Sequence, residues 1–93
     1  MRSWLGRSWL RRDVEHQLYR CWDGEGLLAY IGVTNCYSQR MYHHRVRTPW
    51  WDEVVKITTT PYPDRASALE AETAAIAAEH PIRNHQRTKG AES

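Results

Sequence analysis

The side chains best suited to chemistry lie far apart in the chain. Arg40 and His44 are four positions apart, on one face of a predicted helix, and Glu72 is the one carboxylate on a face of an alanine-rich stretch. Tyr19 and Tyr30 lie on two predicted strands. If they converge, the carboxylate would hold a metal ion, Arg would neutralise phosphate charge, and Tyr or His would handle the proton. That combination suits phosphodiester hydrolysis, and no catalytic-triad, HExxH or P-loop motif competes with it.

The predicted strands have clear boundaries. Residues 16–21 and 27–33 flank the turn sequence Asp23-Gly24-Glu25-Gly26, which indicates a β-hairpin. Residues 53–60 are rich in β-branched side chains, which predicts a third strand, and the Pro61-Tyr62-Pro63 sequence should break it.

Two helices are expected between and after these strands. Residues 36–47 predict a helix with Thr34 or Asn35 as its N-cap, and residues 65–80 predict a second helix capped by Asp64. The element order β-β-α-β-α indicates an α+β domain, with a small three-stranded antiparallel or mixed sheet flanked by helices.

Composition narrows the class of protein. The 93 residues are 41% hydrophobic and 26% charged, and no apolar run has the roughly 20 residues of a membrane span. Two cysteines without a CxxC pair predict neither a disulfide scaffold nor structural zinc. We therefore expect one cytoplasmic domain with no membrane partner.

The formal charge of +2 is unevenly distributed. The first 47 residues hold eight arginines against four acids, whereas the remainder has a slight acidic excess. We divide the chain into a basic arm (1–14), a folded domain (15–85) and a flexible tail (86–93). The arm repeats the sequence Arg-Ser-Trp-Leu, so it would either dock its Trp rings on the domain or contact a nucleic-acid backbone. The arm arginines are Arg2, Arg7, Arg11 and Arg12.

Five sequence elements resemble the GIY-YIG nuclease family. They are Leu18-Tyr19, Tyr30-Ile31-Gly32 eleven positions on, Arg40 with His44, Glu72, and Asn84. Their order and spacing fit the family over residues 16–85. One departure is Gln17-Leu18, where the family has Gly-Ile.

The resemblance implies a role for each residue. It makes Tyr19 the group that deprotonates or orients the attacking water, with Tyr30, Arg40 and His44 around the water and phosphate. It makes Glu72 the ligand of one Mg²⁺ or Mn²⁺ ion. Asn84 would hold the end of the last helix against the site, and Gly32 would allow close backbone approach.

The resemblance leaves competing functions open. The leading expectation is a metal-dependent endonuclease that hydrolyses DNA, single- or double-stranded, with RNA as a further possibility. The alternatives are an inactive nucleic-acid-binding module and a nuclease subunit of a larger repair or mobile-element complex, and a homodimer is possible. Arg45 and Arg47 are further candidates for nucleic-acid contact, whereas Trp50 and Trp51 are expected to pack on the sheet.

Overall fold

The computed structural model describes residues 14–84 and has an α+β fold. Its three strands form one antiparallel sheet in the order β2-β1-β3, which confirms the predicted class and element order. The elements in chain order are β1 (His16–Asp23), β2 (Leu28–Thr34), α1 (Tyr37–Arg47), the short 3₁₀ helix η2 (Trp51–Glu53), β3 (Val54–Tyr62) and α2 (Arg65–Glu79).

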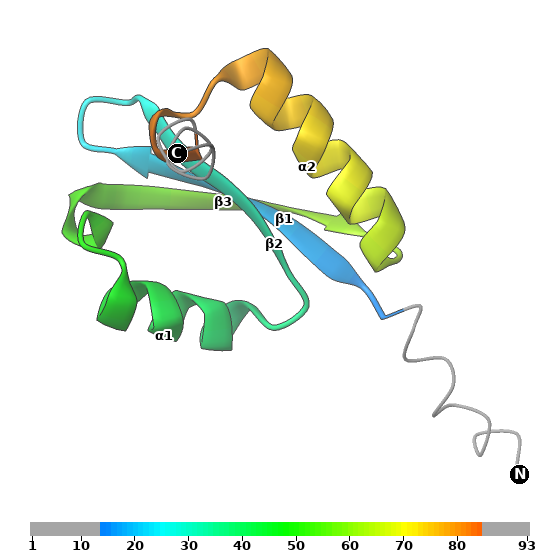
Figure 1. The fold of residues 1–93 in the computed structure, drawn as a ribbon. Helices are drawn as coiled ribbons and strands as arrows, with labels where there is room; N and C mark the ends of the chain where they lie inside the picture. The colour runs from blue at the N-terminus through cyan, green and yellow to red at the C-terminus, as the bar shows by residue number, and fades with distance from the viewer. Residues whose placement is uncertain (1–13, 85–93) are drawn as a thin grey trace, which may run out of the picture.

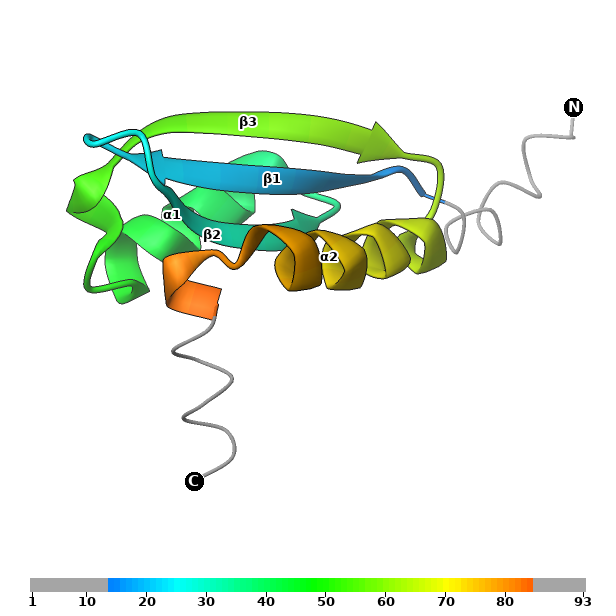
Figure 2. The same ribbon diagram turned by 90° about the horizontal axis from the view of Figure 1, so that it is seen from above.

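The two helices lie on opposite faces of the sheet (Figures 1 and 2). Successive side chains of a strand point to opposite faces, so β1 serves both layers. Leu18 packs with Ala75 of α2, whereas the neighbouring Tyr19 contacts His44 of α1. Tyr19 also pairs with Gly32 across the β1–β2 ladder. The α1 face of the sheet therefore carries the tyrosines of the proposed motif.

The β1–β2 turn forms as its sequence predicts. The Asp23 side chain accepts hydrogen bonds from the backbone N–H groups of Glu25 and Leu27, at 2.9 and 3.0 Å. Gly26 has a φ of 82°, a conformation that glycine adopts without steric cost. This turn fixes the register that brings Tyr19 opposite Gly32.

The core lies between the sheet and α2. Leu18, Ile31 and Ala75 are buried together, and the partly buried side chains packed against them are Leu28, Val33, Tyr62, Ala71 and Ile76. Asp64 caps α2 as predicted, with its side chain accepting from Ser67 N–H at 2.8 Å. The helix ends at a left-handed His80, followed by Pro81.

Two local predictions are wrong. Pro61 does not break the third strand, which continues to Tyr62. Since β3 pairs only with β1 among the described strands, a proline can sit on this outer strand without removing a central ladder hydrogen bond. The N-cap of α1 is Cys36, not Thr34 or Asn35. The Thr34 hydroxyl instead bonds within the preceding turn, to the backbone of Cys36.

No helix within residues 14–84 is both long and apolar enough to span a bilayer.

Candidate active site

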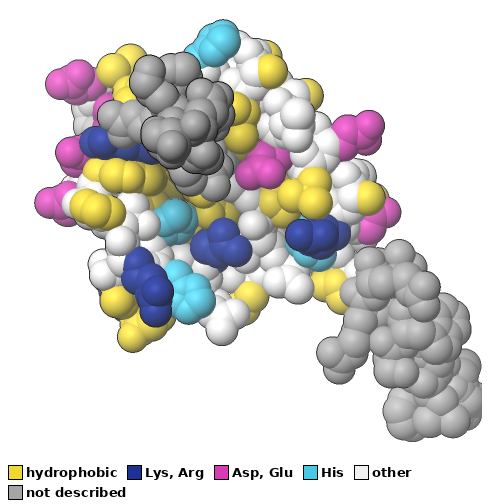
Figure 3. Space-filling model, viewed as in Figure 1, with side chains coloured by type: hydrophobic (Ala, Val, Ile, Leu, Met, Phe, Trp, Pro, Cys, Tyr) yellow, Lys and Arg dark blue, Asp and Glu magenta, His cyan; other side chains and the backbone are white. Residues whose placement is uncertain are grey.

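A pocket of about 510 Å³ lies where the outer edge of β2 meets both helices. It brings together Tyr30, Arg40 and Glu72 from three elements, together with the backbone of Gly32. Figure 3 views this face and shows basic side chains in a row between α1 and the start of α2, with an acidic side chain beside the row. The remaining lining residues are His16, Val33, Thr34, Asn35, Arg65 and Leu69.

Tyr19 lies directly behind the pocket wall rather than on it. Its side chain is completely buried, and its hydroxyl lies against the α1 side of Gly32. A Cβ atom at Gly32 would lie 2.5 Å from that hydroxyl oxygen, so only glycine leaves room for the ring. The Tyr19 hydroxyl and His44 Nε2 are 2.8 Å apart, which makes them a hydrogen-bonded pair across 25 residues of sequence.

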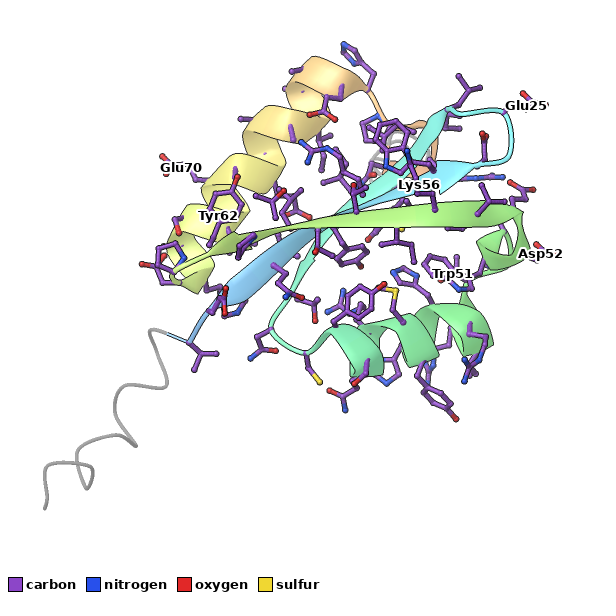
Figure 4. All side chains as sticks on the ribbon, turned by 180° about the vertical axis from the view of Figure 1, so that it is seen from behind. Glu25, Trp51, Asp52, Lys56, Tyr62 and Glu70 are labelled. Atoms are coloured by element: carbon purple, nitrogen blue, oxygen red, sulfur yellow. The ribbon has the colours of Figure 1, made fainter. Side chains whose placement is uncertain are left out.

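His44 is held on all sides by other groups. Its Nδ1 is 2.8 Å from the Thr48 hydroxyl, and its ring stacks on Trp51 with centroids 4.4 Å apart and planes 6° from parallel. Figure 4 shows Trp51 between β3 and α1, in the layer that holds this ring. His43, next in sequence, is exposed, as expected for a neighbour on a helix.

The two partners have strongly shifted pKa values. Burial, together with the positive charge of Arg40 and the neighbouring His43, lowers the pKa of His44 to about 4. Burial raises the pKa of Tyr19 well above its usual range; Tyr30 adds to this rise, while the charge and hydrogen bonding of Arg40 oppose it. At neutral pH the pair is therefore an uncharged phenol and an uncharged imidazole. In the tautomer that carries its proton on Nδ1, His44 donates to the Thr48 hydroxyl, and its Nε2 accepts a hydrogen bond from the Tyr19 hydroxyl.

Helix α2 presents its own polar edge to the pocket. Arg65, Leu69 and Glu72 follow the i, i+4, i+7 spacing of one helix face, and all three line it. Glu70 points away from the sheet (Figure 4). Among residues 14–84 no three His, Cys, Asp or Glu side chains are grouped as a metal cage. One carboxylate fits Mg²⁺, which retains waters and binds through one or two carboxylates and a phosphate.

Asn84 has a positioning role in this structure. It is buried, and its amide makes two bonds to Ile31: Oδ1 accepts from the backbone N–H at 2.7 Å, and Nδ2 donates to the carbonyl at 2.9 Å. The side chain thus pairs with the outer edge of β2 as another strand would. It holds the end of the described chain beside Gly32 but does not line the pocket.

Sequence reasoning missed His16 and Arg65. His16 donates from Nδ1 to the Val14 carbonyl at 2.8 Å, and its Nε2 takes no part in this bond. Arg65 could have been found, because it lies on the same helix face as Glu72, two turns earlier at i−7. His16 has no such signal, since only the crossing of β1 and α2 brings it to the pocket.

The remaining candidates for nucleic-acid contact, and Trp50, lie in different parts of the chain. Arg47 lines a second pocket beside the first, and the Arg45 guanidinium lies 5.5 Å from the Tyr42 ring centroid. Trp50 contacts Tyr30, with centroids 5.6 Å apart. The arm arginines Arg2, Arg7, Arg11 and Arg12, and the tail 86–93, lie outside the described residues.

Comparisons of the chain with protein-family models, with curated proteins and with solved structures gave no match.

Proposed function

We propose that this protein is a metal-dependent endonuclease of the GIY-YIG type, which hydrolyses DNA phosphodiester bonds by attack of water. One observation carries the proposal. Tyr30, Arg40 and Glu72 line a single pocket, and the hydrogen-bonded Tyr19–His44 pair lies immediately behind its wall at Gly32. These groups come from four elements, and the resemblance selects all of them.

Arg40 would bind the reacting phosphate directly, and Glu72 would act on it through a bound metal ion. The guanidinium fork suits two phosphate oxygens and offsets the negative charge that develops as the water oxygen adds to phosphorus. Glu72 would hold one Mg²⁺ or Mn²⁺ ion, which when bound supplies Lewis-acid activation of a phosphoryl oxygen. Tyr30, half-buried on the pocket wall, would orient the water and phosphate.

Tyr19 and His44 would carry away the proton. The Tyr19 hydroxyl stays protonated at neutral pH, because burial raises its pKa, so it can accept a proton only by giving up its own. His44 makes this possible, since its neutral imidazole can take the phenol proton as that phenol takes one from water. The water oxygen then forms its bond to phosphorus, while the bond between phosphorus and the leaving oxygen breaks.

The test compares two neighbouring glutamates on α2. With Mg²⁺ or Mn²⁺ and plasmid or single-stranded DNA, Glu72→Gln should reduce cleavage at least about 100-fold and leave DNA binding intact, because an amide cannot supply charge to a hard cation. Glu70→Gln is the matched control and should cleave as wild type, since Glu70 points away from the sheet. Equal cleavage by wild type and Glu72→Gln would remove the metal-ligand assignment. A wild-type protein that binds DNA but never cleaves it would be the inactive binding module instead.

A further inference from the structure

A second pocket adjoins the active-site pocket along α1, on the other side of Arg40. This second pocket, of about 410 Å³, is lined by Arg40, His43, His44, Arg47 and Thr48. Arg40 belongs to both pockets and is their shared wall. We call the two pockets together the groove.

Each end of the groove carries an arginine and a histidine. Arg65 and His16 lie at the α2 end, and Arg47 and His43 at the α1 end. Arg40 and Arg47 are seven residues apart on one helix, about 10.5 Å along its axis. The row of basic side chains in Figure 3 runs in this direction. Cations therefore occur on both sides of the residue proposed to bind the reacting phosphate.

Among the described residues, the arginines that line the groove have no acidic ion-pair partner; outside the groove Arg20 and Arg83 have one and Arg45 does not. Arg20 and Arg83 form ion pairs with Glu79 and Glu53, at 2.7 and 2.8 Å. Arg40, Arg47 and Arg65 have no acidic ion-pair partner within residues 14–84. Arg65 also begins a helix, where the macrodipole disfavours positive charge. A cation kept there without an acidic partner favours an anionic ligand as its partner.

We infer that the groove holds one nucleic-acid strand by three successive positions, with the reacting phosphate at Arg40 and a flanking phosphate at each end. Arg65 with His16 contacts one flanking phosphate, and Arg47 with His43 contacts the other. This inference rests on the proposed function and specifies its substrate as a phosphodiester inside a strand. A phosphodiester at the end of a strand has a flanking phosphate on one side only, so it would lose one of the two end contacts.

The first measurement is the salt dependence of binding, made without metal so that cleavage does not enter. Arg65→Gln and Arg47→Gln should each lower the slope of log affinity against log salt by about 0.9 for duplex or 0.7 for single-stranded DNA, the value of one phosphate contact. The variant with both substitutions should lower the slope by twice this amount. Lys56→Gln is the matched control and should keep the wild-type slope, because Lys56 lies over Trp22 and lines neither pocket of the groove.

The second measurement assigns the two ends. Oligonucleotides in which one phosphate at a time is replaced by a neutral methylphosphonate should bind wild type less tightly at two positions, one on each side of the central phosphate. Arg65→Gln should be insensitive at one of these positions and Arg47→Gln at the other. Since both arginines are exposed, neither variant should melt far below the wild-type temperature, and Arg65→Gln should melt slightly above it because it removes a positive charge from a helix N-terminus.

The outcomes separate this inference from the proposed function. Unchanged slopes in both arginine variants, with cleavage by wild type intact, would overturn the groove and leave the nuclease proposal standing. Insensitivity of both variants at the same position would also overturn it, because the two ends would then contact one phosphate. Slopes that fall as expected in a wild-type protein that never cleaves would support the groove and refute the nuclease.

Discussion

The two faces of the sheet are packed by different chemistry. On the α2 face, Leu18 and Ile31 are buried against a small helix residue, Ala75, and Ala68 is buried on the same helix. On the α1 face the only fully buried helix residue is His44, which contacts other rings and polar groups. One face thus resembles an ordinary apolar core, whereas the other is built from hydrogen-bonded and stacked aromatic side chains.

This difference separates stability from the proposed chemistry. Apolar burial on the α2 face contributes free energy without needing exact orientation of polar atoms. The α1 face buries titratable groups, which is costly unless each has a partner, and the partners fix the rings in place. Residues of one strand alternate between these tasks, so adjacent positions in β1 should respond to mutation in opposite ways.

The largest expected effect on stability is on the α2 face. Leu18→Ala should lower the free energy of unfolding by about 2–5 kcal/mol, because it removes a buried side chain and leaves a cavity. Cleavage per folded molecule, measured at low temperature, should stay near wild type. Denaturant unfolding followed by circular dichroism gives the first quantity, and plasmid nicking gives the second.

The adjacent residue supplies the matched comparison. Tyr19→Phe should cost about 1–3 kcal/mol of stability, because it leaves His44 Nε2 buried without its partner, and should remove most of the cleavage activity. If Leu18→Ala reduced activity per folded molecule as much as Tyr19→Phe, the division between the two faces would be wrong.

The next effect is a dependence of stability on pH that belongs to the α1 face alone. The folded pKa of His44 is about 4, below the unfolded value of about 6.5, so the unfolded chain binds this proton first. The contribution of neutral His44 to the free energy of unfolding is therefore complete above about pH 6.5 and is lost as the pH falls towards 4. One pKa unit corresponds to about 1.4 kcal/mol, so the shift sets an upper limit on the order of 3 kcal/mol, which solvent screening reduces.

Two variants isolate this contribution from other titrating groups. Unfolding measured from pH 7 to pH 4 should be less steeply pH-dependent in His44→Gln than in wild type. His43→Gln should stay much closer to wild type, because burial is the main cause of the lowered pKa of His44 and the charge of His43 is the smallest. Identical pH profiles for wild type and His44→Gln would contradict the burial of a neutral imidazole.

The sequence predicts local structure well where the cause is local. The hairpin turn follows from Asp23 and Gly26, and the start of α2 follows from Asp64, because each acts on residues within four positions. Pro61 was misinterpreted because its effect depends on whether its strand is central or outer, which is a property of the sheet order.

The candidate site required information of another kind. Periodicity alone puts Arg40 and His44 on one helix face, but nothing local pairs His44 with Tyr19 or places Glu72 near Arg40. The resemblance supplied those associations. It could not supply His16, which reaches the pocket through the packing of β1 beside α2, nor the two bonds from Asn84 to Ile31.

The smallest substitution adds a single methyl group, at Gly32, where β2 meets the site. In Gly32→Ala the new Cβ would lie 2.5 Å from the hydroxyl oxygen of Tyr19 and 2.6 Å from its Cζ atom, so the ring must move. The ring is completely buried and bonded to His44, and its displacement should cost about 1–3 kcal/mol of stability. Activity should fall further than this loss explains, because the displaced hydroxyl can no longer pass its proton to His44. Gly24→Ala is the matched control: its Cβ would meet only Val55, at an ordinary 3.9 Å, so stability and nicking should remain near wild type. A Gly32→Ala protein with wild-type stability and activity would show that Tyr19 does not need its present position, and the proton path through His44 would then be wrong.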